Sequence, residues 1–145
     1  MLSLIQRVSE AAVRVDGEIV GRTGPGLLAL VGIEPGDGDA QVARMAERLL
    51  AYRAFSDEGG RMNRSLADTG GGLLLVSQFT LVADTASGNR PGFSTAATRA
   101  EAEPVFMQLV ARCRGLHRGV ETGRFGAHME VSLVNDGPVT FLLRA

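Results

Sequence analysis

One stretch of the sequence decides the fold: Gly70-Gly71-Gly72-Leu73-Leu74-Leu75-Val76-Ser77-Gln78-Phe79-Thr80-Leu81-Val82-Ala83-Asp84. Three glycines precede an apolar run, and apolar residues at successive positions predict a strand covered on both faces. Ser77, Gln78 and Thr80 interrupt this run, and each buried polar group without a hydrogen-bond partner costs about 1–3 kcal/mol. Side chains alternate along a strand, so Gln78 and Thr80 share one face, and Ser77 and Phe79 share the other. Either these groups bond neighbouring backbone within a core strand, or the strand end opens into a site.

Upstream of this stretch, the pattern predicts strands and one helix. Residues 2–8 and 11–15 alternate, and Asp16-Gly17 is a hairpin turn signal that leads into a returning strand at 18–22. Residues 27–33 form a short apolar run, which predicts a buried strand. Asp39 is a fair N-cap for a helix over 40–53, whose apolar side chains recur with helical spacing.

Downstream of this stretch, residues 83–98 are predicted to form a long loop, and long loops in compact domains tend to be functional. Thr98 and Glu101 have the spacing of a capping box at the start of a second amphipathic helix. Pro104 predicts an irregular start or a kink in that helix. Residues 127–133 and 139–143 are predicted to be two strands joined by a turn at Asn135-Asp136-Gly137-Pro138.

The predicted elements add up to about seven strands, mostly joined by hairpins, and two helices. They indicate an α+β fold with mainly antiparallel, barrel-like β-sheets and two amphipathic helices packed on one side. The chain has 145 residues, of which 45% are hydrophobic, and we expect a single folded domain over residues 1–145.

The composition of the chain limits which partners and which cellular compartment we expect for the protein. The net charge is −1 and all 15 basic residues are arginine, so RNA contact, if any, is expected to be local rather than spread over a basic surface. Cys113 has no partner for a disulfide, no apolar run is long enough to span a membrane, and the N-terminus lacks the layout of a signal peptide. We therefore expect a cytoplasmic protein without membrane contact.

Familiar catalytic patterns are missing from the sequence. His117 and His128 are the two histidines, and their spacing does not suit a metal site. No nucleophile-elbow motif surrounds Ser77 or Thr80, the three glycines precede a strand instead of opening a helix, and no pair of carboxylates lies in an apolar setting. We expect no metal and no cofactor, and we expect backbone groups, hydroxyls or the substrate itself to carry much of any chemistry.

Two motifs resemble a known family. Ser77-Gln78-Phe79-Thr80-Leu81 and Asn135-Asp136-Gly137-Pro138-Val139-Thr140-Phe141 are similar to the signature motifs of the D-aminoacyl-tRNA deacylases, also called D-tyrosyl-tRNA deacylases. The likeness covers the whole chain. Further similar segments are Ile5-Gln6-Arg7-Val8, Met62-Asn63, Arg90-Pro91 with Phe93-Ser94, and Thr122-Gly123-Arg124-Phe125. Gly92 departs from the family pattern, where a small polar residue is expected.

This resemblance implies an editing hydrolase. It would cleave the ester between a D-amino acid and the 3′-terminal adenosine of tRNA, releasing free D-amino acid and tRNA while rejecting L-aminoacyl-tRNA. Glycine mischarged on tRNA(Ala) is a further expected substrate. Members of the family are homodimers, and the resemblance implies that Gly137-Pro138, with a cis peptide bond, enters the site of the partner subunit as a chirality gate.

The resemblance also implies roles for single residues. Ser77, Gln78, Phe79 and Thr80 form the catalytic segment, in which backbone N–H groups around Phe79 and Thr80 hold the oxyanion and Gln78 positions the substrate. Phe125 stacks on the terminal adenine, with Met129 packed nearby. Arg7 braces the inserted Gly137-Pro138.

Some alternatives stay open at this point. Thr80 is either a nucleophile that forms an acyl-enzyme or a structural hydroxyl beside a substrate-assisted reaction, and we favour the second because no base is visible to activate it. The chain as a whole is alternatively a non-catalytic tRNA- or adenosine-binding module of the same fold, or a Thr-nucleophile esterase for small substrates.

Overall fold

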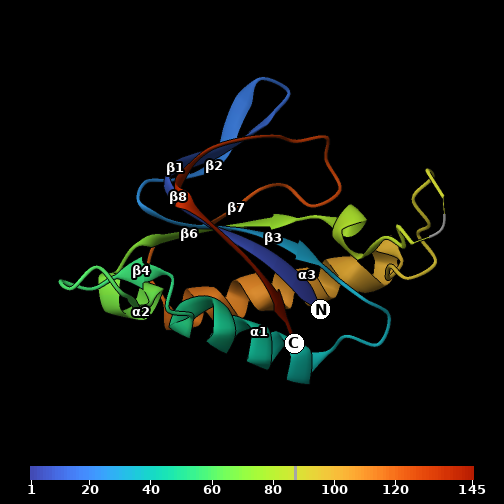
Figure 1. Ribbon diagram of the computed structural model, residues 1–145. Coiled ribbons are helices and arrows are strands. Elements are labelled where there is room, and N and C mark those ends of the chain that lie inside the picture. Colours follow the sequence, from blue (N-terminus) through green and yellow to red (C-terminus); the bar gives the residue numbers. More distant parts are fainter. Residues whose placement is uncertain (87) are drawn as a thin grey trace.

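The computed structural model describes residues 1–86 and 88–145. Its strands and helices follow one another in a mixed order (Figure 1). The elements are β1 (Leu2–Val15), β2 (Glu18–Thr23), β3 (Gly26–Gly32), α1 (Asp39–Ala51), β4 (Phe55–Ser56), β5 (Met62–Arg64), α2 (Leu66–Thr69), β6 (Gly72–Ser77), the 3₁₀ helix η1 (Phe79–Val82), α3 (Arg99–Leu116), β7 (Val120–Thr122) and β8 (Glu130–Arg144).

The long strand β1 is the hub of the main sheet. It pairs antiparallel with β8 along most of its length, while its other edge pairs first with β3 and then with β2. The turn at Asp16-Gly17 closes the β1–β2 hairpin, and both residues adopt positive φ, 51° and 82°. The predicted hairpin is therefore confirmed, whereas the predicted strands at 2–8 and 11–15 are one continuous strand.

The main sheet is mainly antiparallel, because β1 pairs antiparallel with β2, β3 and β8, but it also contains parallel pairs. β3, β6 and β7 are parallel neighbours, which corrects part of the sequence-based prediction. The reason is connectivity, because α1 lies in the crossover from β3 to β6 and α3 lies in the crossover from β6 to β7. Parallel neighbours need a crossover of this kind, and both faces of such strands are usually buried. Leu73, Leu74 and Leu75 are accordingly all fully buried.

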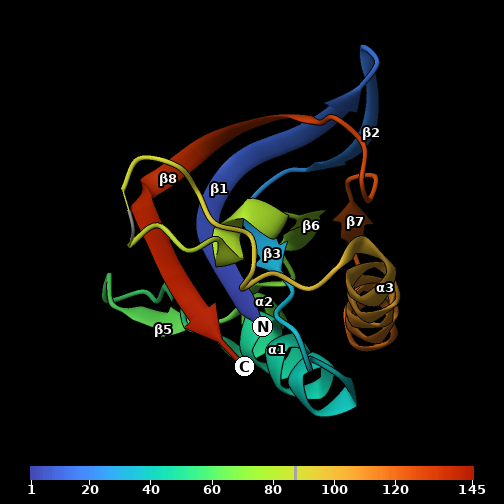
Figure 2. The ribbon, with the colours of Figure 1, turned by 90° about the vertical axis from the view of Figure 1, so that its right-hand side faces the viewer.

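The sheet curls until it is nearly a closed barrel, because β2 approaches β7 (Figures 1 and 2). Gly21 of β2 makes this approach possible, because a Cβ at that position would lie 2.2 Å from the carbonyl oxygen of Thr122. Any side chain at residue 21 would therefore push the two strands apart.

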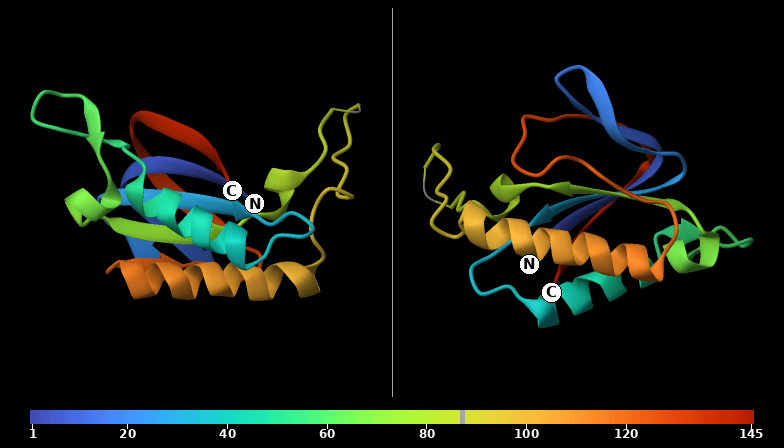
Figure 3. Two further views of the ribbon diagram at one scale, coloured as in Figure 1. Left: turned by 90° about the horizontal axis from the view of Figure 1, so that it is seen from below. Right: turned by 180° about the vertical axis from the view of Figure 1, so that it is seen from behind.

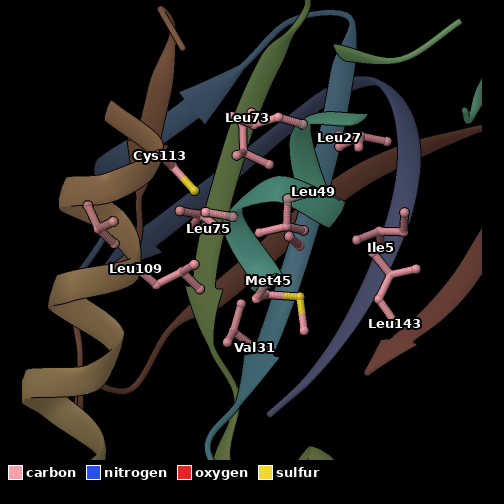
Figure 4. Close-up of a cluster of buried hydrophobic side chains, with 14 of the residues drawn as sticks. Ile5, Leu27, Val31, Met45, Leu49, Leu73, Leu75, Leu109, Cys113 and Leu143 are labelled. Carbon is pink, nitrogen blue, oxygen red and sulfur yellow. The ribbon is translucent and has the colours of Figure 1, made fainter. Parts of the chain in front are cut away.

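The two long helices lie side by side across one face of the sheet (Figure 3). They bury a core together with β1, β3, β6 and β8, as Figure 4 shows. Its labelled side chains are Ile5, Leu27, Val31, Met45, Leu49, Leu73, Leu75, Leu109, Cys113 and Leu143. The prediction of two amphipathic helices packed on one side is confirmed. On the opposite face a smaller cluster around Val8, Val13 and Leu74 is ringed by apolar side chains that are only partly buried.

Local boundaries differ from expectation at several places. Helix α1 begins at Asp39 with Gly38 as its N-cap, so Asp39 is the first helical residue rather than the cap. The capping box of Thr98 and Glu101 is confirmed, but α3 runs on through Pro104 as one helix. The sequence pattern did not predict β7, the short helix α2 or the β4–β5 hairpin.

The C-terminal segment is one strand rather than two joined by a turn. β8 pairs with β1 before and after Asn135-Asp136-Gly137-Pro138, so these residues interrupt a single strand. Among the residues that the structure describes, no helix is long and apolar enough to cross a membrane.

Candidate functional site

The central strand leaves the sheet at the residues that interrupt its apolar run. β6 ends at Ser77, and Phe79–Val82 forms the 3₁₀ helix η1. The predicted alternation of side chains over 77–80 is therefore wrong beyond Ser77. The N–H of Gln78 still donates to the carbonyl oxygen of Val31 at 2.7 Å, which ties the start of η1 to β3.

The turn into η1 leaves backbone donors without partners. The first N–H groups of a helix have no acceptor in the preceding turn. Within the described part of the chain, neither the N–H of Phe79 nor that of Thr80 has a hydrogen-bond acceptor. Two adjacent amide donors are thus available beside Gln78.

A pocket of 420 Å³ opens beside Ser77, Gln78 and Phe79. Its lining brings these three residues together with Phe125 and Met129, which are distant in sequence. The remaining lining residues are Val31, Ile33, Ala97, Arg99, Ala102, Gly126 and Ala127. The wall is mostly apolar, and its polar residues are Ser77, Gln78 and Arg99, which is the usual composition of a small-molecule site.

Phe125 and Met129 are held by packing. The ring of Phe125 lies 5.8 Å from that of Phe106, centroid to centroid, and Phe106 is buried in α3. The sulfur of Met129 occupies the space beside Gly123, where a Cβ would lie 2.6 Å from Sδ. Gly123 therefore has to be glycine for Met129 to take this position.

Thr80 lies next to the pocket and is exposed, and its hydroxyl accepts a hydrogen bond from Nε2 of Gln78. In the described residues no histidine or carboxylate is hydrogen-bonded to the Thr80 hydroxyl. The arrangement orients Thr80 but does not supply it with a general base.

Gly137 and Pro138 lie outside this pocket, in the interruption of β8. The register passes from Thr140 opposite Gln6 to Asn135 opposite Val8, so residues 136–139 bulge out of the ladder across from Arg7. The Gly137–Pro138 peptide bond is cis, and both residues are exposed.

The side chain of Asn135 closes the base of this bulge. Its Oδ1 accepts from the N–H of Val139 and its Nδ2 donates to the hydroxyl of Thr140, both at 3.0 Å. Asparagine often bonds nearby backbone in this way. No separate role was predicted for Asn135, although the tendency of asparagine to bond nearby backbone was a usable signal.

Arg7 contacts the bulge and not the pocket. Its Nε donates to the carbonyl oxygen of Asp136 at 2.9 Å, and its Nη1 donates to that of Ala54, also at 2.9 Å. The carboxylate of Asp136 lies 3.5 Å from Nε. The guanidinium is thus a brace between the bulge and the segment that follows α1.

Within one chain the bulge and the pocket are separated. Arg7 is level with Leu27 and Leu73, whereas Ser77 is level with Val31. Leu27 and Val31 are four residues apart on β3, and at about 3.3 Å per residue the levels of Arg7 and Ser77 lie about 13 Å apart along the strand. Of the predicted site residues, the structure therefore brings together Ser77, Gln78, Phe79, Phe125 and Met129, with Thr80 adjacent, and leaves Arg7, Gly137 and Pro138 elsewhere.

Groups with a displaced pKa lie outside the pocket lining. Burial raises the pKa of the Cys113 thiol to about 11, so this thiol stays protonated and unreactive at neutral pH. A hydrogen bond from the Thr98 hydroxyl lowers the pKa of Glu101, whose carboxylate closes the N-terminus of α3. Neither group supplies an acid or a base to the pocket.

Comparison with known proteins gives one consistent family. A family model described as D-Tyr-tRNA(Tyr) deacylase matches residues 4–144. A protein of Xanthomonas euvesicatoria pv. vesicatoria (strain 85-10) named D-aminoacyl-tRNA deacylase is 76% identical over 145 residues, which cover 99% of each chain. A protein of the same name from Stenotrophomonas maltophilia (strain R551-3) is 73% identical with the same coverage.

Solved structures share the fold. One described as "c-Myc DNA Unwinding Element Binding Protein" superposes with a TM-score of 0.96 at 36% identity, covering 100% of this chain and 99% of that one. Another, described as a probable eukaryotic D-amino acid tRNA deacylase, superposes with a TM-score of 0.79 at 17% identity, covering 99% and 98%. The second likeness concerns the fold alone.

Proposed function

This chain belongs to the D-Tyr-tRNA(Tyr) deacylase family, and we propose that it hydrolyses the ester between a D-amino acid and the 3′-terminal adenosine of tRNA. The products are free D-amino acid and tRNA, and L-aminoacyl-tRNA is rejected. The observation that supports the proposal is a pocket lined by Gln78, Phe79 and Phe125, next to which the N–H groups of Phe79 and Thr80 have no acceptor among the described residues. The high identity to relatives named D-aminoacyl-tRNA deacylase supports the same reaction.

The reaction begins with polarisation of the ester carbonyl. The N–H groups of Phe79 and Thr80 are fixed by η1 and have no acceptor among the described residues, which suits them to hold the oxyanion that develops on hydrolysis. Fixed donors of this kind contribute about 100- to 1000-fold each. Gln78 and Ser77, at the mouth of the pocket, position the aminoacyl group.

The terminal adenosine occupies the aromatic side of the pocket. Phe125 stacks on the adenine, and Phe106 behind it keeps the ring in place. Stacking on an aromatic side chain is a common way for a protein to hold an unpaired base. Met129 packs beside the same face.

Water attacks the ester with help from a hydroxyl of the terminal ribose. Thr80 is structural in this scheme, because its hydroxyl accepts a hydrogen bond from Gln78 and no histidine or carboxylate among the described residues is hydrogen-bonded to it. No metal or cofactor takes part, and the protein acts in the cytoplasm; both of these statements are predictions from sequence. Glycine mischarged on tRNA(Ala) is a further proposed substrate.

The chirality gate is shared between two copies of the chain. Gly137 and Pro138 are exposed on a bulge about 13 Å along the strand from their own pocket, so we assign them to the pocket of a partner subunit. Partly buried apolar side chains around the second core cluster, among them Leu30, Val131 and Leu133, leave that face incompletely covered, which supports a homodimer. Activity is therefore expected to fall when the protein is diluted to monomers, and a fully active monomer would exclude the shared gate.

Release of free amino acid from D-aminoacyl-tRNA tests the proposal against its alternatives. We expect release from D-aminoacyl-tRNA and none from simple esters of the same D-amino acid. Hydrolysis of both substrates indicates a small-molecule esterase. Binding of the tRNA without release indicates a binding module of the same fold.

A further inference from the structure

The pocket contains one charge that the reaction described above does not use. Of the described residues that line it, Arg99 alone is ionised. It lies on the same side of the pocket as Phe125 and Gly126, and the ester chemistry is assigned to Gln78, Phe79 and Thr80. The side chain of Arg99 is exposed, so the charge stays in contact with water and can meet an anionic ligand at the pocket.

The guanidinium of Arg99 packs against the backbone of Gly126. A Cβ at residue 126 would lie 2.7 Å from Nη2 and 2.8 Å from Cζ of Arg99, so the guanidinium fills the space above the glycine. Gly126 also has a φ of +71°, which favours glycine independently. Because Gly126 follows Phe125, the guanidinium lies beside the proposed adenine platform.

The base of the Arg99 side chain is also fixed. Arg99 is the first residue of α3, and the preceding segment is tied to β3 by a hydrogen bond from the N–H of Ala97 to the carbonyl oxygen of Ile33 at 3.1 Å. The carboxylate of Glu101 bonds the N–H and hydroxyl of Thr98 and does not engage Arg99.

The one ion pair that Arg99 makes among the described residues is weak. Nε lies 3.8 Å from the carboxylate of Glu103 one turn along the helix, and the two side chains are 69% and 48% exposed. Exposed pairs of this kind contribute little. The guanidinium can therefore leave Glu103 for a bound anion with only a small loss of free energy.

We propose that Arg99 binds the phosphate on the 5′ side of the terminal adenosine, and so lets the pocket favour an ester carried on a polynucleotide over one carried on a nucleoside. The inference rests on the proposed function, which puts the adenine on Phe125. The 5′-phosphate is attached to the same nucleoside, and a guanidinium matches the geometry of two phosphate oxygens. Glu103, the acidic neighbour, is displaced from Arg99 when the phosphate binds.

Binding of adenosine 5′-monophosphate and of adenosine separates the phosphate from the base. The parent protein is expected to bind the nucleotide about ten-fold more tightly than the nucleoside, and Arg99→Gln is expected to abolish this preference, lowering binding of the nucleotide much more than binding of adenosine. Arg112→Gln removes the same charge from an exposed position on the same helix and is expected to keep the preference. Gly126→Ala keeps the charge but displaces the guanidinium and strains the backbone next to Phe125, so it is expected to weaken binding of both adenosine and the nucleotide. Inorganic phosphate alone serves as the probe for a free-anion site and is expected to compete poorly.

Kinetics on two substrates give a second readout. Arg99→Gln is expected to raise KM for D-aminoacyl-tRNA about ten-fold with kcat nearly unchanged, and to raise KM for D-aminoacyl-adenosine much less. Loss of one phosphate contact should also lower the slope of log KM against log salt by about 0.7. Equal effects on both substrates, or no preference of the parent protein for the nucleotide, would overturn the inference. A preserved nucleotide preference without any deacylation would instead refute the proposed function and leave the phosphate contact standing.

Discussion

The guanidinium of Arg7 and the backbone of Asp136 are joined by a hydrogen bond of 2.9 Å from Nε to the carbonyl oxygen. Asp136 is the residue before Gly137, so this bond fixes the bulge of β8 that carries Gly137 and Pro138. The second branch of the guanidinium holds Ala54, also at 2.9 Å. One side chain near the start of the chain thus sets the position of a motif near its end.

Arg7→Lys is expected to keep the positive charge but lose the two-way brace, because an ammonium is a single point donor. We expect kcat/KM for D-aminoacyl-tRNA to fall about ten-fold or more, with melting lowered by only a few degrees. Arg14→Lys is the matched control, since Arg14 lies on the same strand and, among the described residues, its side chain bonds only the Gly17 carbonyl at 3.4 Å. Equal activity of the two variants would contradict the role of the brace.

Gly137→Ala is expected to distort the bulge. Its φ is +145°, and a Cβ would lie 2.6 Å from Cγ2 of Val139 and 3.3 Å from Nη2 of Arg7. A misplacement of about 1 Å in a positioned group can lower activity about 100-fold. Gly36→Ala is the control for backbone strain alone, because Gly36 has a φ of +86° with open space around it. The account is wrong if both variants deacylate D-aminoacyl-tRNA at the parent rate.

Thr80→Val is expected to retain deacylation within about ten-fold of the parent, because the backbone N–H groups of Phe79 and Thr80 survive the change. Loss of a true covalent nucleophile lowers kcat by about 10⁶. Valine keeps the shape of threonine, so the fold should be undisturbed. Single-turnover deacylation measures the difference. A folded but inactive Thr80→Val, together with a trapped acyl-Thr80 in the parent protein, would show that the hydroxyl is the nucleophile.

Stability is expected to fall in acid partly through Glu34. A hydrogen bond from the N-terminal ammonium, 2.7 Å from the carboxylate, is the main cause that lowers the pKa of Glu34 below its ordinary 4.5. A carboxyl with a lowered folded-state pKa stabilises the protein above about pH 4.5 and loses that contribution as the pH falls further. In urea unfolding at pH 7 and at pH 3, Glu34→Gln should lose less stability than the parent on acidification. An equal loss in both proteins would rule out this contribution.

Much of the fold follows from local patterns in the sequence. Asp16-Gly17 predicts its hairpin because two positive φ values are needed there, and Thr98 with Glu101 predicts the start of α3 because the cap is made within one turn. The parallel pairing of β3 with β6 could not be predicted from a local pattern. Residues 26–32 and 72–77 are far apart in the sequence, and the connection between them contains α1.

The candidate site was predicted where its residues are neighbours in sequence and missed where they are not. Gln78 and Thr80 could be predicted as site residues because they lie within one motif. The change from strand to η1 after Ser77 could not be predicted, because a helix of four residues is too short to show a periodic pattern of apolar side chains. Arg99 was missed because its place in the pocket depends on Gly126, on the far side of α3 and β7 in the sequence. The bulge at 136–139 depends likewise on the register between β8 and β1, at opposite ends of the chain.

Single-turnover deacylation of matched D- and L-aminoacyl-tRNA, prepared with the same tRNA and the two enantiomers of one amino acid, tests the central claim most directly. The account predicts that the protein releases the D-amino acid rapidly. It predicts that L-aminoacyl-tRNA is hydrolysed no faster with the protein than without it. Release of both enantiomers at similar rates, or of neither, would contradict it.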